Sequence, residues 1–133
     1  MEPSSLERVQ QGLALFDQGA YERSLDLLSP DIEWDTTDAV PDGRLYRGRD
    51  AVLGFWRGLP ERWDDFRIEA ERWIEGDAVV LMLGRLEARG VDSGVPVANA
   101  WDQVWRMRGN EVVRCENYSD RTKAWAASGL GTQ

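Results

Sequence analysis

Apolar residues repeat every three or four positions in three segments of the chain, which is the spacing of helices that bury one face. The first segment contains Leu6, Val9, Leu13 and Phe16. Ser4 or Ser5 is suited to cap this helix at its start, and Gly19 is suited to end it. A shorter helix is expected over residues 21–28, before a Ser-Pro pair that stops it, and a third over residues 49–59.

Elsewhere apolar and polar residues alternate, which is the pattern of strands with one buried face. The first strand is expected over residues 31–37, and a meander follows over residues 66–74, 78–88 and 95–107. After a Gly-Asn turn, a last strand leads to a helix that Asp120 caps. This order predicts an α+β domain in which the helices pack on one face of a curved antiparallel sheet.

The net charge of the chain limits the classes of molecule that it is expected to bind. Of its 133 residues, 24 are acidic and 16 are basic, which gives a net charge of −8. Phosphate backbones and anionic membrane surfaces repel such a chain, so nucleic acids and membranes are not expected partners. No apolar run approaches the roughly 20 residues of a membrane span, and residues 1–5 do not resemble a signal peptide. A cytoplasmic protein with a single domain over residues 1–133 is expected.

Histidine is absent, which excludes many common catalytic and metal sites. Without histidine, and with Cys115 as the one cysteine, the chain cannot form an internal disulfide, a Ser-His-Asp triad, or the common zinc and iron sites. No metal or cofactor is therefore expected. Proton transfer near neutral pH would require a carboxylate with a perturbed pKa. Seven tryptophans are many for this length, and some are expected to line a pocket.

Four stretches of sequence stand in a distinctive order and spacing: Gly19-Ala20-Tyr21, residues 28–34 (LSPDIEW), residues 46–52 (YRGRDAV) and residues 100–130. Together they resemble the SnoaL-like branch of the NTF2-like superfamily, which includes ketosteroid isomerase and limonene epoxide hydrolase. The resemblance implies a curved sheet that forms a cone, with helices closing one end around an apolar pocket. Pockets of this kind, apolar with a few polar groups, commonly bind small molecules.

The resemblance also implies which side chains point into that pocket. The substrate-binding residues it implies are Trp34, Trp56, Met82, Trp101, Gln103, Trp105, Cys115 and Asn117, and Val113 is also implied to point inward. Asp38, near the end of the first strand, is the implied catalytic base, with Gln103 and Asn117 holding a carbonyl oxygen. Asp38 equally fits a structural role in a turn, and the two amides equally fit structural hydrogen bonds. Three other tryptophans are expected to be structural: Trp63, Trp73 and Trp125.

The register of the strands decides which face each side chain occupies, since a slip of one residue inverts a strand. For residues 78–88 it is open whether Arg85 and Glu87 face the pocket. On the preferred register the outer face of the sheet carries Leu81, Leu83 and Val104. An apolar face without helices needs cover, and in this superfamily a second subunit usually supplies it. A homodimer through the outer sheet face is therefore expected, and a monomer in sedimentation at micromolar concentration would contradict it.

The known catalytic sets of the superfamily are incomplete in this chain. The ketosteroid isomerase tyrosine falls at Gly12 or a neighbour and its meander acid at Gln103, while the limonene epoxide hydrolase aspartate falls at Asn117. The expected function is a cofactor-free isomerase or cyclase that performs acid–base chemistry on a small hydrophobic carbonyl compound. The alternative is a non-catalytic domain that binds a small molecule. Epoxide hydrolysis is a second alternative, disfavoured because an amide cannot take a proton from water.

Overall fold

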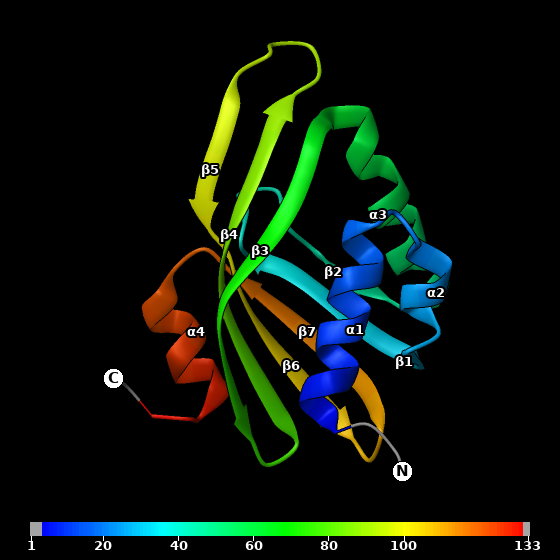
Figure 1. Ribbon diagram of the computed structural model, residues 1–133, viewed down its shortest axis with the longest axis vertical. Coiled ribbons are helices and arrows are strands. Elements are labelled where there is room, and N and C mark those ends of the chain that lie inside the picture. The colour runs from blue at the N-terminus through cyan, green and yellow to red at the C-terminus, as the bar shows by residue number, and fades with distance from the viewer. Residues whose placement is uncertain (1–3, 132–133) are drawn as a thin grey trace.

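The computed structural model describes residues 4–131 of the chain and shows a mixed α+β fold with a curved, open sheet (Figure 1). In chain order the elements are α1 (Ser5–Asp17), α2 (Tyr21–Leu25), β1 (Leu28–Asp38), β2 (Leu45–Arg47), α3 (Arg49–Arg62), β3 (Trp63–Gly76), β4 (Val79–Gly90), β5 (Pro96–Ala100), β6 (Asp102–Arg108), β7 (Glu111–Tyr118) and α4 (Arg121–Ser128). The fold class that the sequence predicts is confirmed. Residues 1–3, on which part of the signal-peptide argument rests, lie outside the described residues.

Capping side chains fix where the first helix, α1, and the last helix, α4, begin. The Ser4 hydroxyl accepts a hydrogen bond from the Glu7 amide, and the Glu7 carboxylate accepts one from the Ser4 amide, which together cap α1. The Asp120 carboxylate accepts hydrogen bonds from the amides of Thr122 and Lys123 at the start of α4. Both caps were predicted from residue type and position.

The strand order in the sheet is β2-β1-β7-β6-β4-β3, and β5 pairs with β4 beyond the end of β6. All neighbours are antiparallel except β1 and β7, which run parallel, with Trp34 opposite Cys115. The wholly antiparallel sheet expected from the sequence is therefore wrong at this pair. Alternation within a strand shows its faces but not its partner, so the sequence pattern did not contain this information.

The long strand expected over residues 95–107 is divided into β5 and β6 at Trp101. The Trp101 amide donates to the carbonyl of Gly84, and a Cβ at Gly84 would lie 2.5 Å from the carbonyl oxygen of Glu69. Glycine at position 84 therefore permits a close approach of three backbone segments. Beyond this point β3, β4 and β5 form a distal ribbon, residues 63–70, 84–90 and 96–100, that extends past the rest of the sheet (Figure 1).

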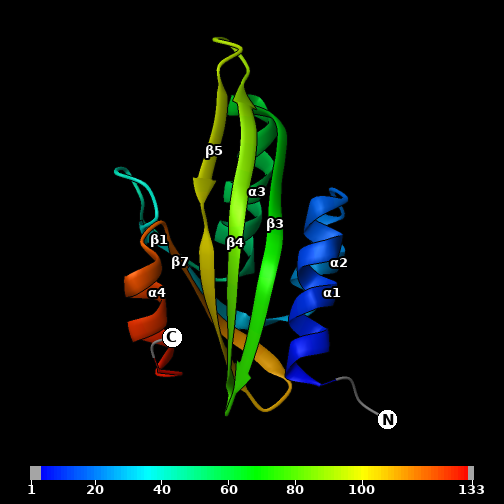
Figure 2. The ribbon, with the colours of Figure 1, turned by 60° about the vertical axis from the view of Figure 1, so that its left-hand side comes forward.

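Helices cover both faces of the sheet, not one face as expected. A larger apolar core lies between the sheet and α1–α3, and a smaller one lies between the sheet and α4 on the opposite side (Figure 2). Leu81, Leu83 and Val104 belong to the smaller core, where Ala124 and Trp125 of α4 pack on them. Since the chain itself covers these residues, the argument that a second subunit must cover them fails.

The register chosen for the meander is correct for β4 and wrong for part of β7. Met82 and Leu86 pack in the larger core, so Arg85 and Glu87 point away from it. In β7 it is Val112, not Val113, that packs in this core. A bulge between the β6 and β7 pairs Arg106–Arg114 and Met107–Val112 inserts one residue and shifts the alternation.

Candidate functional site

An enclosed aromatic pocket of about 210 Å³ lies between the sheet and α1–α3. Its aromatic lining consists of Phe16, Trp34, Phe55, Trp56, Trp63, Phe66 and Trp101. The aliphatic lining is Val40, Leu59, Ile68 and Leu86, and the polar lining is Thr36, Asp42, Arg62 and Asn117. Val40, Asp42 and Arg62 are exposed, so they mark the rim, where the loop after β1 meets the end of α3.

Several rings of the lining, together with Trp105 behind them, fix one another's positions. Trp34 lies edge-on to both Trp56 and Trp105, with ring centroids 5.2 and 5.5 Å away. Phe16 is edge-on to Trp56 at 5.2 Å. Aromatic pairs in this geometry are favourable beyond their buried area, and buried rings have little freedom to turn. The pocket is therefore preformed.

The deepest polar group of the pocket is Asn117, which is almost fully buried. Its Oδ1 accepts hydrogen bonds from Trp101 Nε1 at 3.0 Å and from Gln103 Nε2 at 2.9 Å. Its Nδ2 donates to the carbonyl of Asp35 at 3.0 Å. The hydroxyl of Thr36 likewise bonds to the backbone of Arg44. Asn117 is thus engaged through both its oxygen and its nitrogen, which is the structural role that the sequence left open, whereas Gln103 Oε1 is buried without a hydrogen-bond partner among residues 4–131.

Asp38, the predicted base, is not among the residues that line the aromatic pocket. Its side chain is 47% exposed, and its carboxylate lies 3.8 Å from the ammonium of Lys123 on α4. Its carbonyl accepts from the amide of Ser119, which fastens the end of β1 to the start of α4. The catalytic role of Asp38 stays a prediction that this geometry does not favour, because the carboxylate faces solvent and a lysine.

The carboxylate that does line the pocket, among the described residues, is Asp42. It lies in the loop Pro41-Asp42-Gly43 after β1, where all three residue types are common in turns. A Cβ at Gly43 would collide with the backbone carbonyl of Thr36, so glycine allows this loop to fold back against β1. The fold-back brings Asp42 over the pocket rim, and no periodic pattern in the sequence signals it.

Four of the eight predicted binding residues line the pocket: Trp34, Trp56, Trp101 and Asn117. The other four, Met82, Gln103, Trp105 and Cys115, are buried in the layer behind the lining. Burial raises the pKa of the Cys115 thiol well above its usual range, so this cysteine packs as a small apolar residue. Trp63, expected to be structural, lines the pocket.

Sequence reasoning missed the residues that the end of α3 supplies. The helix was expected to stop at Leu59, before Pro60, but it continues to Arg62. Pro60 cannot donate a hydrogen bond to the carbonyl of Trp56, but the helix continues for the two residues that follow it. The continuation carries Arg62 to the pocket rim and places Trp63 and Phe66, at the start of β3, beside it.

A carboxyl with a raised pKa lies next to the pocket but outside its lining. Burial raises the pKa of Asp17, at the end of α1, although the amide of Ile68 and the charge of Arg67 lower it in part. Asp17 Oδ1 accepts from that Ile68 amide at 3.4 Å. Its neighbour Phe16 lines the pocket, but Asp17 does not.

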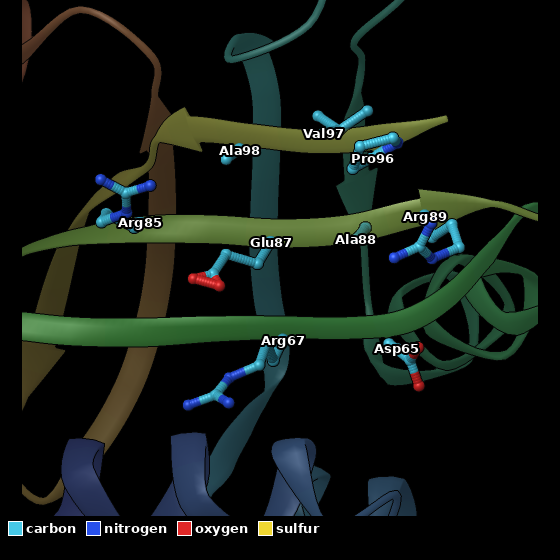
Figure 3. A pocket seen from close by; sticks show the side chains of 9 residues that line it. All are labelled: Asp65, Arg67, Arg85, Glu87, Ala88, Arg89, Pro96, Val97 and Ala98. Atoms are coloured by element: carbon cyan, nitrogen blue, oxygen red, sulfur yellow. The ribbon is translucent and has the colours of Figure 1, made fainter. Parts of the chain in front are cut away.

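A second, wider hollow of about 360 Å³ lies on the outer face of the distal ribbon (Figure 3). Arg67, Arg85, Glu87 and Arg89 line it, together with Pro96 and Ala98 of β5 (Figure 3). Most of these residues are exposed and charged, and the hollow is open to solvent. A site for a small apolar molecule is expected to be enclosed and apolar, so the aromatic pocket is the better candidate.

Neither a membrane-spanning helix nor a metal-binding cluster occurs in residues 4–131. Of the helices within residues 4–131, none is both long and apolar enough to cross a membrane. In the same part of the chain, no three cysteine, aspartate or glutamate side chains are grouped so that they could hold a metal ion.

Comparison with known families decides where the chain belongs. A model of the SnoaL-like domain matches residues 9–115, which include every buried residue of the larger core and all of the pocket lining except Asn117. The protein is a member of the SnoaL-like family. The resemblance seen in the sequence is thereby confirmed.

Solved structures similar to this SnoaL-like protein share its whole fold at low identity. An NTF2-like protein from Burkholderia thailandensis is 21% identical, with a TM-score of 0.82 over 98% of this chain and 100% of that chain. TerC, co-crystallised with polyporic acid, is 22% identical, with a TM-score of 0.76 over 92% and 95%. A proposed SnoaL-like polyketide cyclase from Shewanella putrefaciens is 12% identical, with a TM-score of 0.75 over 96% and 97%. At these identities the likeness shows the fold alone.

One curated protein matches part of the chain. A stretch of 76 residues is 37% identical to the urease accessory protein UreD of Picosynechococcus. The match covers 55% of this chain and 27% of UreD, so the chain spans about a quarter of that protein. A match of this extent does not show a shared activity.

Proposed function

We propose that this SnoaL-like protein binds a small aromatic or cyclic molecule in the aromatic pocket. The observation that carries the proposal is the lining: an enclosed space of about 210 Å³ surrounded by rings, with inner polar groups that bond to one another. A dry apolar cavity of about 150 Å³ already holds benzene. The pocket therefore has room for a substituted ring. The structure of TerC with polyporic acid supports a ligand of this kind in this fold.

The ligand is expected to carry a hydrogen-bond acceptor. Trp56 lines the pocket at 1% exposure, and its Nε1 has no hydrogen-bond partner among residues 4–131. A buried donor left unpaired costs about 1–3 kcal/mol. A carbonyl or phenol oxygen that accepts from this indole would remove the cost, which agrees with the carbonyl compound predicted from the sequence.

Acid–base catalysis of the isomerase or cyclase type is the second candidate, and one observation favours it. Asp42 and Arg62 place a carboxylate and a guanidinium together in the lining at the rim. A carboxylate can take a proton next to a carbonyl, and a guanidinium can stabilise the developing enolate. In this reading Asp42 is a better base than Asp38. No observation favours epoxide hydrolysis, since the oxygen and the nitrogen of the Asn117 amide are both held in hydrogen bonds within the protein.

A titration with paired variants separates binding from catalysis. Cyclic enones, β-ketones and epoxides are added to the wild type and to the variants Asp38→Asn and Asp42→Asn. Tryptophan fluorescence reports binding, and chromatography reports product formation. We expect a saturable fluorescence change with at least one cyclic carbonyl compound in all three proteins. Product from the wild type and Asp38→Asn but not from Asp42→Asn would establish the enzyme. No fluorescence change with any compound would contradict the binding proposal.

The homodimer and the cytoplasmic location remain predictions. The apolar patch that motivated the dimer is covered by α4, so the part of the outer face left for a second copy is the charged distal ribbon (Figure 3). Sedimentation at micromolar concentration tests the homodimer, and a monomer would contradict it.

A further inference from the structure

The aromatic pocket has a neighbour on the other side of Phe55. An outer hollow of about 320 Å³ shares four residues with the pocket: Asp42, Phe55, Leu59 and Arg62. Four more belong to the outer hollow alone: Arg44, Tyr46, Gly54 and Gly58. Tyr46 stacks on Phe55 with ring centroids 4.5 Å apart. The two spaces therefore adjoin along the second half of α3, and one elongated molecule can occupy both.

The two glycines leave this outer hollow open, and the fold does not require them. They stand four residues apart inside α3, so both lie on the same side of the helix. A Cβ at either position would meet nothing within 4 Å. Glycine inside a helix costs about 1 kcal/mol relative to alanine. No steric conflict requires glycine at either position. The consequence of having glycine there is free space beside the pocket rim.

The charges in the outer hollow favour an anion. Arg44 and Arg62 face one carboxylate, Asp42, and neither guanidinium has an ion pair or a side-chain hydrogen bond within the part of the chain that the structure describes. Elsewhere Arg106, Arg114 and Arg121 are all paired with carboxylates. A local excess of positive charge is notable in a chain with a net charge of −8.

We propose that the outer hollow is a carboxylate-binding subsite, so that the ligand is an amphiphilic acid. Its apolar ring fills the aromatic pocket, a short chain passes Phe55 and Leu59, and its carboxylate binds Arg62 and Arg44. The planar guanidinium fork matches a carboxylate in two parallel hydrogen bonds. This inference rests on the proposed function, because the pocket must hold the apolar end.

The test compares acids with amides of the same shape. Phenylalkanoic acids from phenylacetate to 6-phenylhexanoate, and their primary amides, are titrated by calorimetry at low and high salt. We expect the acid of the right length to bind about tenfold more tightly than its amide at low salt, an advantage that shrinks as salt screens the charges. The amides report on the aromatic pocket alone.

Variants assign the preference to the outer hollow. Arg44→Gln, a change in the outer hollow alone, should weaken binding of the acid and leave binding of the amide unchanged, and adding Arg62→Gln should bring the acid to the affinity of the amide. Gly58→Leu should do the same by filling the space, while raising the melting temperature. Asp42→Asn should strengthen acid binding, because it removes the opposing charge. Arg23→Gln, a charge change on α2 away from both spaces, is the matched control and should change nothing.

The outcomes separate this inference from the proposed function. Equal binding of acid and amide by the wild type would overturn the carboxylate subsite and leave the aromatic pocket standing. A preference for the acid that survives in the double arginine variant would also overturn it, since the anion would then bind elsewhere. If neither acids nor amides bind, both the subsite and the pocket proposal fail.

Discussion

Replacing Arg121 by methionine should lower the free energy of unfolding by about 3–5 kcal/mol, the usual cost of leaving a buried charge without its partner. The Asp102 carboxylate is 0% exposed, and Arg121 donates to its two oxygens at 3.0 and 3.2 Å. Within residues 4–131, the remaining hydrogen-bond partner of the Asp102 side chain is the amide of Gly84, at 3.1 Å. After the change, a fully buried carboxylate keeps a single neutral donor.

The effect should extend to the pocket, because Asp102 stands between Trp101 and Gln103. Urea unfolding followed by circular dichroism measures the stability, and ligand titration measures the pocket. Lys123→Met is the matched control, since its pair with Asp38 is exposed and pairs of that kind contribute about 0–1 kcal/mol. Adding Asp102→Asn to Arg121→Met should restore part of the loss by removing the charge. Equal stability of Arg121→Met and Lys123→Met would contradict the account.

Replacing Asn117 by alanine should lower the free energy of unfolding by about 3–5 kcal/mol. The change leaves several buried polar groups without a hydrogen bond, at a cost of about 1–3 kcal/mol each. The side chain holds Trp101 Nε1, Gln103 Nε2 and the carbonyl of Asp35 at once. It therefore ties β1 and β7 to the ring of Trp101. Without it the Trp101 ring loses its fixed position in the pocket lining.

Ligand affinity should consequently fall by at least about tenfold, or about 1.4 kcal/mol, measured by tryptophan fluorescence under conditions where the variant is folded. Gln103→Met is the matched control. It removes one donor to Asn117, but it also removes the Gln103 Oε1 atom, which is buried without a hydrogen-bond partner within residues 4–131. Gln103→Met should therefore lower the free energy of unfolding by no more than about 1 kcal/mol. A smaller loss in Asn117→Ala than in Gln103→Met would show that Asn117 is not the organising group.

The predictions from sequence succeeded where a local period carries the information. Helical spacing located α1 and α3, alternation located the meander, and the face occupied by Met82 and Leu86 followed from it. The failures arose where the decisive contact joins distant segments. The division at Trp101 depends on its approach to Gly84, and the position of α4 depends on Arg121 meeting Asp102.

The candidate site shows the same division. Trp34, Trp56 and Asn117 lie on regular elements and Trp101 follows directly on β5, so strand and helix patterns could place them in the lining. Asp42 and Arg62 lie where regular structure ends. A turn sets the direction of the Asp42 side chain, and the length of α3 sets the position of Arg62. Apolar periods of two or 3.6 residues predict neither the path of a turn nor the last residue of a helix. The sequence therefore pointed to Asp38, at the end of the first strand, and nothing in its pattern marked Asp42.

The parallel pairing of β1 with β7 has a consequence for how the chain folds. Trp34 and Cys115 are neighbours in the sheet although most of the chain separates them, so a large loop must close before β1 finds its place. Contacts of long sequence separation slow folding. During synthesis, the apolar side of β1 and of α1–α3 stays without its partner strand until residues 112–118 have been made. The aromatic pocket is therefore completed late in synthesis, and until then its rings are an apolar surface open to aggregation.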